Sequence, residues 1–182
     1  AADAPNAASV TVREAVETLT AEYRDRLEEI SDTVQYDRQD ITANDDVYYI
    51  RWQDVLAVFS SYEAGSEQGA PVAALTEEQL DKLRETMWAM NAVDYSTHAE
   101  TAVIETTDKN GKVTATEITE TVLVIELTHK TPDEMAADHH FTIRQNTYLQ
   151  LLQDPQYEKL WRNCSAVLHR AVENLCPPTA PA

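Results

Sequence analysis

The chain has 182 residues, of which 32 are acidic and 14 are basic, so its formal net charge is −18. Binding nucleic acid or an anionic membrane surface requires a basic patch, and the sequence contains none. We therefore expect no nucleic-acid partner. We also expect no membrane span, because no apolar run approaches the ~20 residues that a bilayer requires. The negative charge either keeps the protein in solution or indicates a partner that is basic or that binds through a metal ion.

The length and the 43% hydrophobic fraction suit one folded domain. Residues 1–10 are expected to be a flexible N-terminal segment, 11–176 a single domain, and 177–182 a flexible tail. The start, AADAPNAAS, is typical of the small polar tail that remains beyond a signal peptide or lipoprotein leader, so we expect an exported protein. If one helix carried Cys164 and Cys176, about 18 Å would separate them at ~1.5 Å per residue, so their oxidation state stays open.

The first half of the chain is predicted to be helical. Thr11 and Glu14 have the spacing of a capping box, and a narrow apolar stripe follows, which predicts a long amphipathic helix, a helical arm, over 11–31. Residues 32–50 show no clear period. Within them, the apolar run at 47–50 is either a strand or the lead into the next helix. That helix, over 52–62, is predicted to be buried.

A second capping box formed by Thr76 and Gln79 predicts another helix to about Asn91. The pattern then changes to β-branched residues on both sides of an Asn110-Gly111 pair, which favours a tight primed turn. We therefore predict a long antiparallel hairpin over about 97–128. Its distal part, residues 105–120, is almost all Thr, Glu and Lys and is expected to project into solvent or into a partner.

The last part of the domain is predicted to be helical again. Thr131-Pro132 opens a helix, residues 141–152 continue or restart it, and Asp154-Pro155 starts a last one. The fold class expected from the whole pattern is α+β, mostly helical, with one long antiparallel β-hairpin packed on the helices.

Two groups of residues are candidates for binding. Exposed aromatic side chains anchor protein interfaces or stack on sugars, and a projecting turn is accessible to a partner. The alternative for the tryptophan is a place in the core. The candidates are Tyr48, Tyr49, Trp52, Lys109, Asn110, Gly111 and Lys112.

Candidates for chemistry are few, because nucleophile and phosphate-loop motifs are absent. Glu63 could act as the acid of a glycosidase, with Glu67, Asp94 or Glu100 as a second carboxylate, but nothing in the sequence fixes such a pair. A weak alternative is a metal site at His139 and His140, joined by Asp138 or Glu134. Adjacent helical residues point about 100° apart, however, so the two histidines do not easily share an ion. We expect no cofactor.

Several ordered blocks of sequence carry a family resemblance: WQDVLAVF at 52–59, LTEEQLDKL at 75–83, MWAMN at 87–91 and ETVLVIELTHKT at 120–131. They are followed by shorter matches at 133–136, 145–146 and 149–152. Over residues 47–162, this order resembles the non-catalytic domain upstream of the NlpC/P60- or M23-type peptidase domain in cell-wall hydrolases of Gram-positive conjugative and integrative elements. The catalytic domain has no counterpart here, so no catalytic residue carries over.

The resemblance implies an extracytoplasmic domain that positions a wall hydrolase or contacts the envelope or the transfer machinery. The expected function is therefore an exported, non-catalytic accessory module of the Gram-positive cell envelope. Its partner would be a protein or the cell wall, and the oligomeric state stays open. The alternative is a peptidoglycan-degrading glycosidase that uses Glu63.

Overall fold

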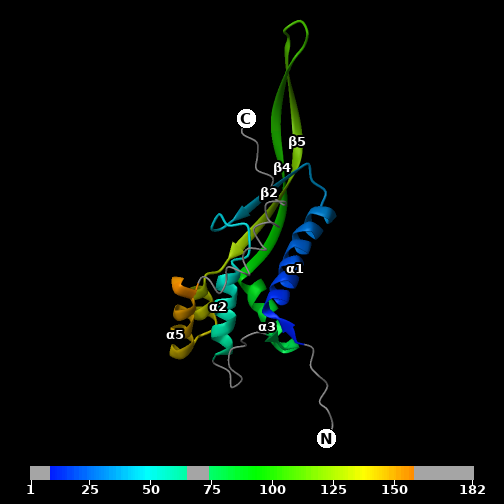
Figure 1. Cartoon of the computed structure of the whole chain (residues 1–182). Coiled ribbons are helices and arrows are strands. Elements are labelled where there is room, and N and C mark those ends of the chain that lie inside the picture. Colours follow the sequence, from blue (N-terminus) through cyan, green and yellow to red (C-terminus); the bar gives the residue numbers. More distant parts are fainter. Residues whose placement is uncertain (1–8, 65–73, 158–182) are drawn as a thin grey trace.

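A long β-hairpin projects from a body of helices in the computed structural model of this protein, which describes residues 9–64 and 74–157 (Figure 1). The helices are α1 (Val12–Thr33), α2 (Trp52–Glu63), α3 (Glu77–Met90), α4 (Pro132–Asp138) and α5 (Ile143–Leu152), followed by a 3-10 turn η1 (Pro155–Tyr157). The strands are β1 (Val10–Thr11), β2 (Arg38–Ala43), β3 (Ala74–Leu75), β4 (Asn91–Thr107) and β5 (Val113–His129). The α+β class expected from the sequence is confirmed.

The expectation of a single hairpin was incomplete, because the described strands form two sheets. The larger sheet has the order β2-β5-β4, with β2 parallel to β5 and β4 antiparallel to it. β2 lies within 32–50, where no period was evident. It is a short edge strand whose side chains are exposed or half-buried, so it lacks the apolar alternation of an interior strand. The smaller sheet pairs Val10 with Leu75 and brings the start of α1 next to α3.

The hairpin begins six residues earlier than expected, at Asn91. Its first residues already alternate, since Val93 and Tyr95 lie on one face and Asp94 and Ser96 lie on the other. This short alternation adjoins the end of α3 directly, without a turn signal between them. The sequence therefore predicts the start of the strand at the later threonine-rich run.

Four of the helices begin with a complete capping box, in which a threonine hydroxyl and a Glu or Gln side chain satisfy each other's backbone N–H groups. The pairs are Thr11 with Glu14, Thr76 with Gln79, Thr131 with Glu134, and Thr142 with Gln145. The last pair decides the question that the sequence left open: residues 141–152 restart a helix, at Ile143, rather than continue α4.

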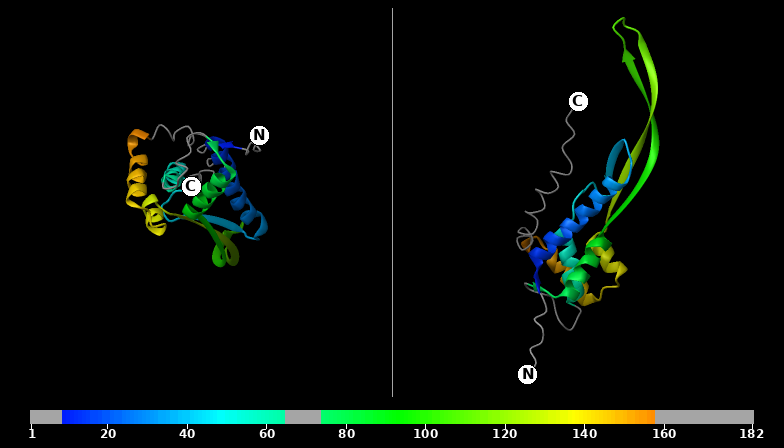
Figure 2. Two further views of the ribbon diagram at one scale, coloured as in Figure 1. Left: turned by 90° about the horizontal axis from the view of Figure 1, so that it is seen from below. Right: turned by 90° about the vertical axis from the view of Figure 1, so that its right-hand side faces the viewer.

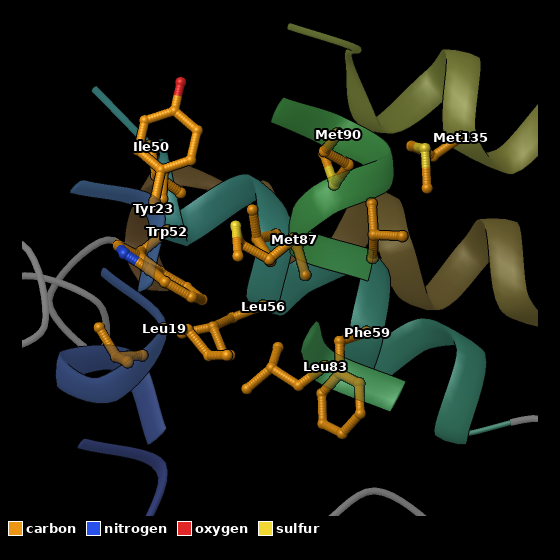
Figure 3. Packing of buried hydrophobic residues seen from close by; sticks show 14 of the residues in the cluster. Leu19, Tyr23, Ile50, Trp52, Leu56, Phe59, Leu83, Met87, Met90 and Met135 are labelled. Atoms are coloured by element: carbon orange, nitrogen blue, oxygen red, sulfur yellow. The ribbon is translucent and has the colours of Figure 1, made fainter. Parts of the chain in front are cut away.

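Helix α2 forms the centre of the body, with α1 and α3 on one side of it and α4 and α5 on the other (Figure 2). The side chains of its middle turns are buried all round, from Val55 to Phe59. They pack with Leu19 of α1 and with Leu83 and Met87 of α3 (Figure 3). Because α2 is buried on every side, displacing it would expose the core. Helix α2 therefore holds the surrounding helices in position.

Polar contacts join α1 to α3 at the edge of this core. Glu22 accepts hydrogen bonds from Arg84 Nε at 3.0 Å and from Trp88 Nε1 at 2.9 Å. The Tyr23 and Trp88 rings pack beside them, with centroids 5.5 Å apart. Among the described residues, none of the helices is both long enough and apolar enough to cross a bilayer.

Candidate interaction site on the projecting hairpin

The part of the hairpin that stands clear of the body is the most distinctive surface of the molecule (Figures 1 and 2). We call residues 99–121 the distal hairpin. Strand β2 pairs with β5 only from Val122 to Leu127, and Asp37 extends this contact by one residue through two hydrogen bonds to the backbone of Thr121. From Glu120 to the tip, the distal hairpin is a two-stranded ribbon with two unpaired edges. Its side chains are almost all exposed, including Val103 at 64% and Val113 at 56%. We expected residues 105–120 to project into solvent or into a partner, and nearly all of them are exposed.

The tip of the hairpin has a wider turn than the tight primed turn that we predicted. Strand pairing ends at Thr107 and Val113, and Gly111 donates its N–H to the carbonyl of Asp108 at 3.0 Å. Only Gly111 has a positive φ, of 78°, whereas a type I′ turn would require one at Asn110 as well. The arrangement is a β-turn followed by a left-handed glycine.

The carboxylate of Asp108 fixes the shape of this tip. Its Oδ1 accepts the backbone N–H groups of Asn110 at 2.8 Å and Lys112 at 3.0 Å. The candidates Lys109, Asn110, Gly111 and Lys112 therefore share one exposed, ordered turn.

A charge network marks the point where the distal hairpin meets the body. Glu100 and Glu120 lie directly opposite each other on β4 and β5. Arg38 of β2 lies between them, with Nη2 2.6 Å from Glu100 and Nε 4.0 Å from Glu120, and it also pairs with Asp40. The hydrogen bond from His98 and the charge of Arg38 hold the pKa of Glu100 below its usual value. Three carboxylates share one guanidinium, so the site keeps a net negative charge.

The aromatic cluster is not a single surface. Trp52 is 1% exposed, and its Nε1 donates to Thr20 Oγ1 at 2.9 Å, so it belongs to the core and is not available to a partner. The prediction that Trp52 binds a partner is therefore wrong. Tyr48 and Tyr49 lie in the irregular segment before α2, with 39% and 37% of their surface exposed. They remain accessible, but the distal hairpin lies elsewhere on the molecule.

A second polar cluster, which sequence reasoning missed, lies where β2 and β5 end together. Nδ1 of His129 lies 2.8 Å from Oδ1 of Asp45, whose other oxygen is 2.7 Å from Arg51 Nη1. Burial raises the pKa of Asp45, but the hydrogen bond from His129, the backbone N–H of Val47 and the charge of Arg51 outweigh it and hold that pKa below 3.8.

This second cluster joins two segments of backbone through hydrogen bonds. Nε2 of His129 is buried and has no hydrogen-bond partner among the described residues, so a substrate cannot reach it as a base. The side chain of Asn44 also holds the backbone of His129, donating to its carbonyl at 2.9 Å and accepting from its N–H at 2.8 Å. Asn44, Asp45 and His129 thus clamp the loop after β2 to the end of β5.

Glu63 does not gain the surroundings of a glycosidase acid from the described residues. It is the last residue of α2 and accepts a hydrogen bond from Gln79 at 3.4 Å. Asp94 and Glu100 lie on β4, which leaves the body in the direction opposite to the end of α2 (Figure 1). The third suggested partner, Glu67, lies outside the described residues.

The two adjacent histidines follow the last residue of helix α4, and the described residues gather no set of metal ligands around them. His140 has a φ of 52° as the chain leaves the helix, and the ring of His139 meets Tyr62 edge-on with centroids 6.0 Å apart. Asp138 pairs instead with Lys130 at 2.7 Å, and this contact holds the pKa of Asp138 below its usual value. Across the described ranges, no three His, Cys, Asp or Glu side chains are grouped to hold a metal.

A shallow depression of about 430 Å³ lies between α4 and α5. It is open to solvent, and its lining consists of Asp133, Ala136, Ala137, His140, Phe141 and Asn146. This lining contains no serine, threonine, cysteine or lysine side chain. Cys164 and Cys176, like most of the helix predicted after Pro155, lie outside the described residues.

Comparison of the chain with family models, with curated proteins and with solved structures finds no match.

Proposed function

We propose that this chain is a non-catalytic interaction module of the Gram-positive cell envelope, and that its distal hairpin contacts a protein partner. The observation that carries the proposal is the hairpin itself, a two-stranded ribbon with exposed apolar side chains and two free edges. Isolated two-stranded ribbons are marginally stable in water, and free edges are templates for pairing. A surface of this kind is costly to maintain unless another molecule covers it.

The extracytoplasmic place of the module rests on the resemblance to wall-hydrolase accessory domains. The polar clusters of the described residues agree with a non-catalytic role, because their members are engaged in capping, clamping and strand bridging. In this proposal the helical body holds the hairpin in a fixed direction. The partner recognises the hairpin tip, Lys109 to Lys112, and the ribbon behind it.

Two experiments test the two halves of this proposal. The first incubates the purified chain with Gram-positive sacculi and analyses the supernatant for muropeptides by mass spectrometry, with an active wall hydrolase as the positive control. We expect no release. Released fragments would contradict the non-catalytic half, and loss of release in Glu63→Gln without loss of stability would assign the chemistry to that carboxylate.

The second experiment places a photoreactive amino acid at Thr106 in the distal hairpin and, as a matched control, at Glu28 on the exposed side of α1. Both variants are exposed to envelope extract from a Gram-positive cell and irradiated. We expect a discrete cross-linked protein from position 106 and none from position 28. Equal cross-linking from the two positions would contradict the proposed contact role of the hairpin.

A further inference from the structure

Strand β4 has the longest unpaired edge among the described strands. Every residue from Asp94 to Thr107 is exposed, although Leu123 and Ile125 of the neighbouring strand β5 are fully buried. The helices therefore cover β5 and leave β4 in solvent. At ~3.3 Å per residue, the exposed stretch is about 43 Å long, whereas an ordinary strand is ~17–20 Å long. A partner strand of ordinary length fits along it.

The hydrogen-bond pattern shows which backbone groups of β4 face outward. Lys130 donates its N–H to the carbonyl of Met90 at 2.9 Å, and Asp108 donates its N–H to the carbonyl of Lys112 at 3.0 Å. Bonded and non-bonded pairs alternate in an antiparallel ladder, so the even-numbered residues of β4 bond to β5. The odd-numbered residues direct their N–H and C=O groups away from β5. From Tyr95 to Thr107, no described residue pairs with these outward groups.

The edge of β4 lacks the features that usually keep a strand edge from pairing, which are lysine, proline and bulges. The strand contains no Lys, Arg, Pro or Gly, and its register with β5 is continuous. The opposite edge of the sheet differs, because β2 covers β5 from Val122 to Leu127 and Asp37 covers Thr121. An open edge suits strand addition, in which main-chain hydrogen bonds supply the affinity.

The charges on β4 and β5 favour a basic partner, because neither strand contains Lys or Arg. Asp94 and Glu126 lie directly opposite each other, and neither carboxylate has an ion pair or hydrogen bond within the described ranges. Glu100 and Glu120 form the same kind of pair, but Arg38 lies between them. Like charges directly opposite destabilise a strand pair. Asp94 and Glu126 therefore lack the cation that the other pair has. The acidic residues of the two strands are Asp94, Glu100, Glu105, Glu117, Glu120 and Glu126.

A second copy of β4 is a poor occupant of this edge, because it brings more carboxylates and no Lys or Arg. The lysines of the hairpin, Lys109 and Lys112, lie in the turn beyond the paired strands. On β4 itself, the odd-numbered face is uncharged from Val93 to Val103, whereas the other face carries Asp94 and Glu100. An incoming strand that alternates uncharged residues with lysine or arginine matches both faces.

We propose that β4 accepts, along its outer edge, an extended segment of a protein partner in which uncharged residues alternate with lysine or arginine. This inference rests on the proposed function, because it names the edge and the chemistry by which the hairpin holds its partner. A basic side chain of the segment lies beside Asp94 and Glu126, as Arg38 lies between Glu100 and Glu120. The added strand extends the sheet beyond β4.

Three synthetic peptides of about ten residues test the chemistry of the occupant, with binding to the full chain followed by fluorescence anisotropy. The first alternates threonine and lysine, and it should bind saturably. The second alternates threonine and glutamate, and it should not bind. The third keeps the lysines but replaces every second threonine by proline, so it cannot form a strand and should bind at least tenfold more weakly. No binding of the first peptide, or equal binding of the first and third, would overturn strand addition.

Two matched substitutions identify the edge. Thr101 and Thr119 lie directly opposite each other, and both direct their N–H outward, from β4 and from β5 respectively. Proline at either position keeps the hydrogen bonds between the two strands. Thr101→Pro should weaken binding of the threonine–lysine peptide at least tenfold, and Thr119→Pro should weaken it less than twofold. Equal losses, or a larger loss from Thr119→Pro, would overturn the assignment to β4.

A second pair of substitutions tests the charge. Asp94→Asn removes one of the two unpaired carboxylates and should weaken binding of the threonine–lysine peptide three- to tenfold. Asp32→Asn makes the same change at an exposed position on α1 and should weaken it less than twofold. Equal effects would show that the peptide responds to the overall charge of the protein and would overturn the proposed place of its basic residue.

Hydrogen exchange of the unmodified chain tests the same edge without a substitution. The threonine–lysine peptide should slow exchange of the outward amides of Thr97, Ala99 and Thr101, and it should leave that of Thr119 unchanged. Absence of protection along β4 would overturn strand addition. If position 106 nevertheless cross-linked to a discrete envelope protein, the proposed function would stand without it, whereas loss of both results would overturn both proposals.

Discussion

The two halves of one hairpin differ in what holds them in place. Near the body, β5 lies between two strands, and Leu123 and Ile125 are fully buried beneath the helices. Beyond Val122, the same two strands continue in register but lose the third strand, the helices and almost all burial. Hydrogen bonding between β4 and β5 is thus continuous, whereas hydrophobic support stops. The distal hairpin is therefore held together by cross-strand pairing alone. The hydrophobic burial that stabilises the fold comes from the part of the hairpin next to the helices.

The largest effect expected from this comparison is a core deletion at the base. Leu123→Ala removes a fully buried side chain and should lower the free energy of unfolding by about 2–5 kcal/mol. Val113→Ala, on the same strand but 56% exposed, should change it by less than about 0.5 kcal/mol. Urea denaturation followed by circular dichroism measures both. Similar losses in the two variants would mean that base and distal hairpin fold as one equally supported unit.

A smaller effect is expected at the clamp where β2 and β5 end. Asp45→Asn removes the charge that accepts the His129 hydrogen bond and should cost about 1 kcal/mol at pH 7. The pKa of Asp45 is lowered in the folded state, so its charged form stabilises the fold above the ordinary pKa of 3.8. That contribution is lost as the pH falls through the lowered pKa. The difference between variant and native chain should therefore shrink below about pH 4.

The control for the clamp is Asp46→Asn, the same chemical change one residue later. Asp46 is exposed and has a φ of 57°, which asparagine tolerates well. Unfolding curves of both variants between pH 7 and pH 3 should show a pH-dependent gap for position 45 and almost none for position 46. A pH-independent gap at position 45 would indicate that packing, and not charge, holds the loop.

The smallest global effect is expected at the tip. Gly111→Ala forces a side chain into a positive φ of 78°, which costs roughly 1–2 kcal/mol locally. This cost should fall on the distal hairpin alone, so its amides should exchange faster with solvent while the global unfolding free energy changes by less than about 0.5 kcal/mol. Hydrogen exchange separates the two quantities. Asn110→Ala, where φ is not positive, is the matched control and should change neither.

The sequence was sufficient for features that depend on local chemistry. Capping boxes at Thr11 and Thr76 predicted where helices begin, because their hydrogen bonds join residues three apart. The Asn110-Gly111 pair predicted a turn at the right place, although its type was wrong, since Asp108 supplies part of the geometry through two side-chain hydrogen bonds. The exposed tip of the candidate site was therefore accessible to sequence reasoning.

Features that depend on distant residues were not accessible. Strand β2 is short and polar, and only its pairing with β5 makes it a strand. The contact of Arg38 with Glu100 joins residues 62 apart, and that of Asp45 with His129 joins residues 84 apart. For Trp52 the sequence supports two places, a surface anchor beside two tyrosines and the core of a buried helix, and local pattern does not decide between them. Its place in the core follows from the hydroxyl of Thr20 and from the helices around α2.

The most direct test of the difference between the supported base and the distal hairpin is to shorten the hairpin in register. His98 lies opposite Val122, so replacing residues 99–121 by Asn-Gly leaves a strand pair closed by a two-residue turn. We expect the shortened chain to keep the unfolding free energy of the full chain to within about 1 kcal/mol, because the only contacts with the body that it loses are the exposed ones of Asp37 and Arg38. We also expect it to lose capture of a partner. A shortened chain that unfolds, or one that still captures a partner, would contradict the separation of a stable body from a projecting contact element.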